Sequence, residues 1–118
     1  MIGWRSDLKI VLVAGPIDFR AGINRLAAIV SDALSRDPYC GDVFVFRSKR
    51  RTDRLKLIHF DGSGMILATK WLESGQFVWP PVRDGVITLT HAQMTLLIGG
   101  MNWTRLQEND VKRPKIAG

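Results

Sequence analysis

The chain of 118 residues is 46% hydrophobic and 24% charged, with a formal net charge of +6. These values are typical of one globular domain and argue against a disordered chain, and no apolar run approaches the roughly 18 to 20 residues that span a bilayer. Cys40 is the single cysteine, which excludes an internal disulfide and a cysteine metal site, so we expect a reduced, cytoplasmic setting.

The N-terminal third predicts a strand followed by a helix. Residues 9–15, KIVLVAG, combine consecutive aliphatic residues with a Gly15-Pro16 stop, which indicates a buried strand and not a secretory leader. Over about 20–35, apolar residues recur at spacings of three and four, which predicts an amphipathic helix. We expect Asp18 to cap this helix, and Pro38 to end it.

From Val43 onward the apolar period changes to two, which predicts short strands joined by tight turns. The predicted strands are VFVFR, LKLIHF, MILATKWL, FVWP and VITLT, within residues 43–90. Thr90 and Gln93 form a capping-box pattern that opens a short helix through Ile98. The predicted fold is α+β: a curled antiparallel meander sheet with an N-terminal strand, and one long amphipathic helix and one short C-terminal helix packed on one face. We expect one domain over 1–107 and a loose polar tail over 108–118.

Nearly all of the net charge lies in the ten residues from Arg47 to Lys56, which include the facing ends of two predicted strands and the turn that joins them. This stretch holds six cations and Asp53, hence +5 of the total +6. A local cationic patch of this density favours a polyanion, most often nucleic acid; the alternative is a solvated turn that protects the sheet edge. The predicted nucleic-acid-binding residues are Arg47, Lys49, Arg50, Arg51, Arg54 and Lys56, with Lys56 expected on a strand at the margin of the patch.

Several short motifs occur together, in a fixed order, between about Leu8 and Trp103. They are Asp-x-Arg-x-Gly at 18–22, Phe-x-Phe before the basic residues at 44–46, Lys-Leu at 56–57, Asp-Gly-x-Gly at 61–64, Leu-Glu-x-Gly-x-Phe-x-Trp-Pro at 72–80 and Leu-Thr-x-x-Gln at 89–93. This combination resembles the small accessory protein, called TnpB or Orf2, of the insertion sequence 66 family of bacterial mobile elements. Phe19 and Phe60 depart from the family pattern, in which methionine and tryptophan are usual.

The resemblance implies an accessory role in transposition beside a larger transposase encoded by the same element, and no catalytic activity or cofactor. We therefore expect two partners, the DNA at the element ends and the transposase, with the protein associated with the nucleoid when bound to DNA. The alternative is a protein adaptor that docks on the transposase and uses its basic residues against an acidic surface. The oligomeric state and the DNA sequence that is bound stay open.

Three further residues are weaker candidates for partner or phosphate contacts. Arg20 can reach a phosphate or a partner carboxylate, but the interpretation we favour is a structural ion pair with Asp18. Trp71 and Trp79 can offer a surface for base stacking or partner docking. The alternative is that the aromatic residues, with Phe44, Phe46 and Phe77 among them, fill the core.

An enzyme is not predicted. The carboxylates needed for a two-metal site are present in number, but Asp61, Glu73 and Asp84 stand in turn sequences that already account for them. His59 and His91 are 32 positions apart and belong to no metal-binding motif. No phosphate-binding glycine loop or nucleophile elbow occurs.

Overall fold

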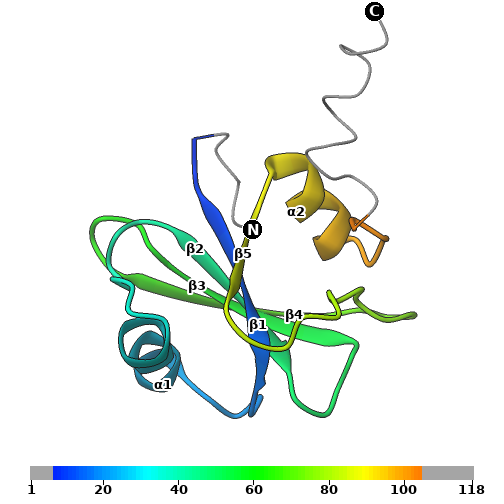
Figure 1. Cartoon of the computed structure of the whole chain (residues 1–118), viewed down its shortest axis with the longest axis horizontal. Coiled ribbons are helices and arrows are strands. Elements are labelled where there is room, and N and C mark those ends of the chain that lie inside the picture. Colours follow the sequence, from blue (N-terminus) through cyan, green and yellow to red (C-terminus); the bar gives the residue numbers. More distant parts are fainter. Residues whose placement is uncertain (1–6, 105–118) are drawn as a thin grey trace, which may run out of the picture.

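The computed structural model describes residues 7–104, and the centre of this region is a five-stranded sheet with the order β4-β3-β2-β1-β5 (Figure 1). Helical segments connect and follow the strands, so the predicted α+β class is confirmed. The helices are α1 (Ile23–Ala28), the π-helix η1 (Ile29–Ala33) and α2 (His91–Ile98). The strands are β1 (Ile10–Ile17), β2 (Val43–Ser48), β3 (Arg54–Phe60), β4 (Met65–Trp71) and β5 (Val86–Leu89).

The sheet is mixed and not antiparallel throughout, which corrects the predicted meander. β1 pairs with β2 in parallel, from Ile10 opposite Val43 to Ile17 opposite Ser48. The chain must return to the start of β1 before it enters β2, and α1 with η1 provides that crossover. Only β2, β3 and β4 form the antiparallel meander that the sequence predicts. β5 lies beside β1, antiparallel to it, at the other edge of the sheet.

The predicted strand FVWP, residues 77–80, does not form. This segment instead packs against the turn between β2 and β3, where the Phe77 N–H donates to the Thr52 carbonyl over 2.8 Å. The Trp103 indole N–H donates to the Val78 carbonyl over 2.7 Å. Pro80 and Pro81 follow at once and have no N–H to donate to a strand ladder, so the segment closes one end of the core without joining the sheet.

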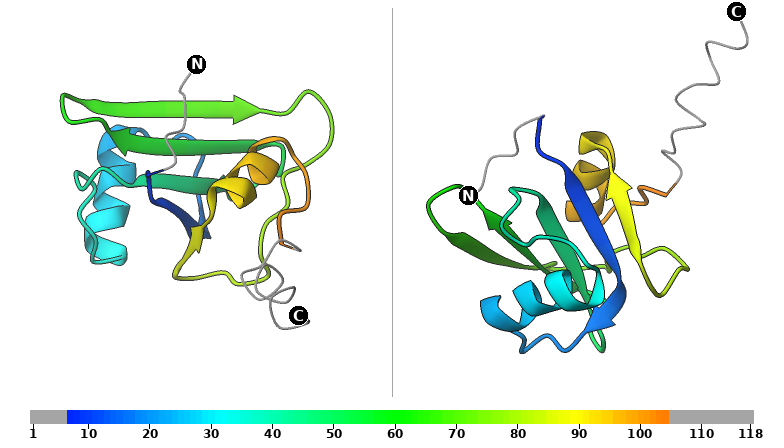
Figure 2. Two further views of the ribbon diagram at one scale, coloured as in Figure 1. Left: turned by 90° about the horizontal axis from the view of Figure 1, so that it is seen from above. Right: turned by 60° about the vertical axis from the view of Figure 1, so that its left-hand side comes forward.

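The two helices lie on opposite faces of the sheet, so the prediction that both pack on one face is wrong (Figure 2). Alternate residues of β1 point to opposite faces: Ile10 and Leu12 belong to the cluster with α2, and Val11 and Val13 to the cluster with α1. Both faces of the central strands are thus apolar and each needs a cover. We name the two sides of the sheet the α1 face and the α2 face.

The first helical segment is shorter than predicted, and Asp18 does not cap it. Its N-cap residue is Gly22, which makes no side-chain cap. After α1, the Leu34 N–H donates to the Ile29 carbonyl five residues back, the spacing of a π-helix. The regular helix over 20–35 is therefore replaced by α1 and η1 within 23–33. The predicted tail, 108–118, lies outside the described residues, so the domain boundary at 107 stays a prediction.

The capping box that opens α2 is confirmed and sets a stability prediction. The Gln93 N–H donates to Thr90 Oγ1 over 3.1 Å, and the Thr90 N–H donates to Gln93 Oε1 over 2.8 Å. Thr90→Ala should lower the free energy of unfolding by about 1 kcal/mol, because one N–H in the first turn loses its acceptor. Urea denaturation measures this loss. Thr90→Ser keeps the hydroxyl and should retain most of the stability; equal losses in the two variants would contradict the capping role.

Candidate nucleic-acid interface

The turn between β2 and β3 holds the basic residues at one end of the sheet. The hydroxyl of Ser48, which is buried, accepts the backbone N–H groups of Arg50 (3.4 Å) and Arg51 (3.1 Å). The Lys49 N–H donates to the Ile17 carbonyl at the end of β1 over 2.7 Å. These bonds fix the backbone of the turn, while the side chains of Lys49, Arg50 and Arg51 are exposed.

The loop after β1 places Arg20 beside this turn. Asp18 accepts hydrogen bonds from the Arg20 backbone N–H (2.9 Å) and from its guanidinium at Nε (3.1 Å) and Nη2 (2.8 Å). These bonds, the side-chain ones first, hold the pKa of the Asp18 carboxyl well below its usual range. The predicted ion pair is confirmed. An exposed pair of this kind stabilises a fold very little, and its main effect is to orient Arg20, whose side chain is 90% exposed.

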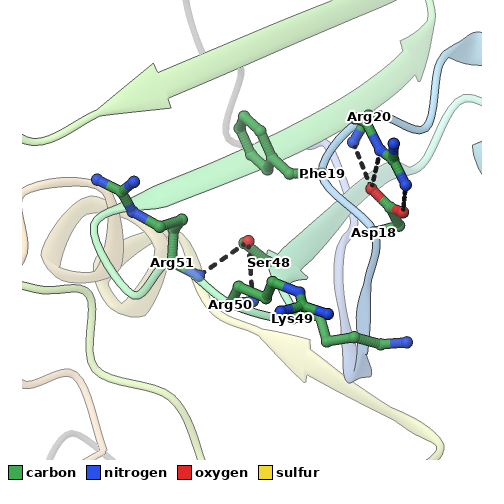
Figure 3. A pocket seen from close by; sticks show the side chains of 7 residues that line it. All are labelled: Asp18, Phe19, Arg20, Ser48, Lys49, Arg50 and Arg51. Carbon is green, nitrogen blue, oxygen red and sulfur yellow. Dashed lines mark hydrogen bonds and ion pairs between the residues drawn. The ribbon is translucent and has the colours of Figure 1, made fainter.

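The loop and the turn line a common open pocket of about 410 Å³ (Figure 3). An adjoining pocket of about 440 Å³ extends the hollow along α1 and adds Arg25. Parallel pairing explains the arrangement, because it brings the ends of β1 and β2, Ile17 and Ser48, side by side. We call this cationic region the tip surface: Arg20, Arg25, Lys49, Arg50 and Arg51.

The other three predicted cations have structural partners and do not line either pocket. Arg47, on the α2 face, donates from Nη1 to the Pro80 carbonyl (3.4 Å), and its guanidinium carbon lies 5.3 Å from the Trp79 ring centroid. Burial, and then the charge of Arg83, lower the pKa of Arg47. Lys56, on the α1 face, donates from Nζ to the Ala21 carbonyl over 2.8 Å.

Arg54 is likewise held in place, by an indole and a carboxylate. Its guanidinium carbon lies 3.7 Å from the centroid of the Trp71 ring, and its Nε lies 3.5 Å from Asp53 Oδ1. Only 17% of the Arg54 side chain is exposed. Lys56 is a strand residue, as predicted, and the six cations of the basic stretch do not form one continuous surface.

The two candidate tryptophans differ in exposure. Trp71 ends β4 and is 58% exposed. Trp79 is partly buried against the core of the α2 face, where its ring also lies 5.9 Å from that of Phe77. The predicted core residues Phe44, Phe46 and Phe77 are buried. Trp71 therefore offers its ring to a partner far more readily than Trp79 does.

Sequence comparison identifies the family. The family model described as "IS66 Orf2 like protein" matches residues 8–108. The chain belongs to the IS66 Orf2-like family. Two relatives from Sinorhizobium fredii (strain NBRC 101917 / NGR234) have the printed names "Uncharacterized protein y4jC" and "Uncharacterized protein y4hO". The first is 54% identical over 114 residues, 97% of each chain; the second is 38% identical over 103 residues, 87% of this chain and 89% of the relative. No solved structure matches the chain.

Membership of this family gives the protein a transposition-related accessory role, in agreement with the resemblance found in the sequence. Phe19 and Phe60, the two residues that depart from the family pattern, each contact an aromatic or a cationic side chain. The Phe60 ring meets Tyr39 edge-on, with centroids 5.4 Å apart. Lys56 Nζ lies 4.7 Å from the centroid of the Phe19 ring.

The sequence did not point to two residues of the candidate site, Arg25 and Ser48. Arg25 lies in α1, and only the packing of α1 beside the loop after β1 brings it to the tip surface. Ser48 was overlooked because a serine between a strand and a turn is common; the available signal was its place directly before Lys49, since a serine hydroxyl at the start of a turn can accept the N–H groups that follow.

Potential ligands for metal ions are scattered in the described part of the chain. Between residues 7 and 104, no three histidine, cysteine, aspartate or glutamate side chains gather where they could hold one ion. Over the same residues, no helix combines the length and the apolar character needed to cross a bilayer.

Lys56 should position the loop after β1, since its ammonium group is bonded to the Ala21 carbonyl. Lys56→Met keeps an unbranched side chain of similar length but loses this hydrogen bond, and it should lower the free energy of unfolding by about 1 kcal/mol. The Ala21 N–H, which donates to the Asp18 carbonyl within the loop over 3.0 Å, should exchange faster with solvent because the loop is held less firmly. Lys70→Met on β4 is the matched control and should change neither measurement. Unchanged exchange at Ala21 in Lys56→Met would contradict the positioning role.

Proposed function

We propose that this IS66 Orf2-like protein is a non-catalytic accessory factor that binds DNA at the ends of its element through the tip surface and also contacts the transposase. One observation carries the proposal. Five cationic side chains from three segments, the loop after β1, helix α1 and the β2–β3 turn, line two adjoining pockets with Asp18 as the single carboxylate. The residues that line the two pockets therefore carry a formal charge of +4.

The cations of the tip surface are available to a polyanion. The side chain of Arg20 is 90% exposed and that of Arg51 is 55% exposed. Guanidinium groups suit phosphate oxygens because they donate two parallel hydrogen bonds. Charges that served solubility alone would not need a backbone tied to Ile17 and Ser48. A fixed backbone reduces the conformational entropy lost when the side chains meet phosphates.

Phosphate contacts of this kind position a protein on DNA without reading its sequence. The tip surface therefore supports affinity, with a strong salt dependence, and not selection of one base sequence. Preference for the element ends would come from the transposase, or from a DNA shape or strand structure found at those ends. The proposed function therefore includes the transposase as a second partner.

Removing two cations from the turn tests the DNA proposal. The double variant Arg50→Ala/Arg51→Ala should bind duplex DNA about tenfold more weakly or worse near 50 mM salt. It makes fewer phosphate contacts than the wild type, so its binding releases fewer counterions. The slope of log K against log salt should become shallower by about 2, roughly 1 for each contact. Fluorescence anisotropy between about 50 and 200 mM salt measures both, with the element's terminal repeats compared with random duplex of equal length.

The matched control removes the same charge at the opposite end of the sheet. Lys9 precedes β1 and Arg36 follows η1, so Lys9→Ala with Arg36→Ala should leave the slope unchanged. Equal weakening in the two double variants would show that only net charge matters. If the wild-type protein binds no DNA at low salt, the DNA proposal is wrong. The adaptor alternative then predicts that Arg50→Ala with Arg51→Ala loses the transposase in a pull-down.

Three carboxylates of the described region, Asp18, Asp53 and Asp61, are engaged by neighbouring residues, which supports the non-catalytic part of the proposal. Asp61 Oδ1 accepts the N–H groups of Ser63 and Gly64 and the Ser63 hydroxyl, each at 2.9 Å. These bonds hold the turn between β3 and β4 and lower the pKa of Asp61. Asp18 is bonded to Arg20, and Asp53 lies beside Arg51 and Arg54.

We expect no nicking of supercoiled DNA by the protein in the presence of Mg²⁺ or Mn²⁺. Agarose gels of plasmid incubated with the purified protein provide the measurement. Asp61→Asn is the informative variant, because the amide oxygen can still accept the turn hydrogen bonds while the charge is lost. Metal-dependent nicking by the wild type that disappears in Asp61→Asn would contradict a non-catalytic role.

A further inference from the structure

The α1 face of the sheet carries two cation–aromatic pairs close to the tip surface. Lys56 Nζ lies 4.7 Å from the Phe19 ring centroid, and the guanidinium carbon of Arg54 lies 3.7 Å from that of Trp71. Arg54 and Lys56 are two positions apart on β3, so they project from the same face about 7 Å apart. Trp71 is the direct cross-strand partner of Arg54 and so shares that face. We call Phe19, Lys56, Arg54 and Trp71 the stacking row.

The stacking row lies beyond the core of the α1 face. That core includes Phe46 and Ile58, which are buried, and closes against α1 through Leu26. Farther along β3 and β4 toward the tip, cations and aromatic rings take the place of aliphatic residues. Trp71 at the end of β4 is 58% exposed. Arg54 can cover one side of the indole, and the exposed area leaves ring surface for another planar group.

The row is continuous with the tip surface. Phe19 stands between Asp18 and Arg20 in the sequence and lines the pocket of about 410 Å³ together with Lys49, Arg50 and Arg51 (Figure 3). The ring is only partly buried, and Lys56 approaches it from the sheet. The cations of the turn and one aromatic ring of the row, that of Phe19, therefore meet in a single hollow, and Lys56 and Arg54 extend the row from Phe19 to Trp71.

Aromatic rings beside a cationic groove are the elements with which proteins hold unpaired nucleic-acid strands. Bases of a duplex are stacked on each other and cannot lie on a protein ring, whereas unpaired bases can. The cations that pin Phe19 and Trp71 also limit the rotation of these side chains, so less conformational entropy is lost on stacking. A purely structural row would have no need of a tryptophan that is more than half exposed.

We propose that the stacking row binds unpaired bases of DNA while the tip surface binds the adjoining phosphates, so that the preferred ligand is a single strand or a duplex with a single-stranded end. This inference rests on the proposed DNA-binding function and specifies the form of DNA that is bound. Trp71 and Phe19 contact bases; Arg54 and Lys56 position the two rings.

Three DNA ligands of equal length test the inference: a single strand of thymidines, a blunt duplex and a duplex with a single-stranded overhang. The wild type should bind the single strand and the overhang about tenfold more tightly than the blunt duplex at the same salt. Trp71→Ala should weaken binding to the single strand about tenfold and change blunt-duplex binding less than twofold. Trp71→Phe should restore most of the loss.

Tyr39→Ala is the matched control, since Tyr39 is also 58% exposed but packs on Phe60, at the far end of β3 from the turn. It should leave single-strand binding unchanged. Blunt duplex bound as tightly as the single strand, or Trp71→Ala weakening both ligands equally, would overturn the inference while the proposed function stands. If the wild-type protein binds none of the three DNA ligands, both this inference and the proposed DNA-binding function are wrong. Thermal unfolding of Trp71→Ala should stay cooperative, with a midpoint only a few degrees below that of the wild type because the contact with Arg54 is lost, and this shows that the variant is folded.

Discussion

The parallel pairing of β1 with β2 is the constraint on which the site depends. It places Ile17 opposite Ser48 and lets the Lys49 N–H donate to the Ile17 carbonyl over 2.7 Å. The loop that carries Arg20 and the turn that carries Lys49 to Arg51 therefore leave the sheet at the same end. An antiparallel arrangement of these two strands would place the loop and the turn at opposite ends of the sheet and divide the cations between them.

The geometry of the strands also divides the basic stretch. Successive side chains of a strand point to opposite faces, so a run of cations that continues into β2 and β3 cannot form one surface. Arg47 turns toward Trp79 on the α2 face, while Arg54 and Lys56 turn toward Trp71 and Phe19 on the α1 face. Only the residues between the strands remain exposed to solvent, and Arg20 and Arg25 join them there.

The DNA contacts that we propose for the tip surface and the stacking row are two kinds of interaction with different ranges. Phosphate attraction acts over about 10 Å at moderate salt and does not depend on base identity. Stacking requires contact, and it distinguishes paired from unpaired bases. Within the accessory role of the IS66 Orf2-like family, such a combination suits a protein that approaches DNA by charge and then selects by strand structure. The two contributions can be separated by substitution because Trp71 lies outside the turn.

Features that depend on neighbours along the chain can be predicted from the sequence. The five strands of the sheet, the Thr90–Gln93 capping box, the Asp18–Arg20 pair and the exposed turn of Lys49 to Arg51 all follow from local pattern and hydrogen bonding. Four other features emerge only from the folded molecule: β1 is parallel to β2, the helices cover opposite faces, 77–80 is not a strand, and Arg25 joins the site. These outcomes depend on contacts between residues far apart in the sequence, and periodicity and turn chemistry carry no information about which distant segment a strand or a cation will meet.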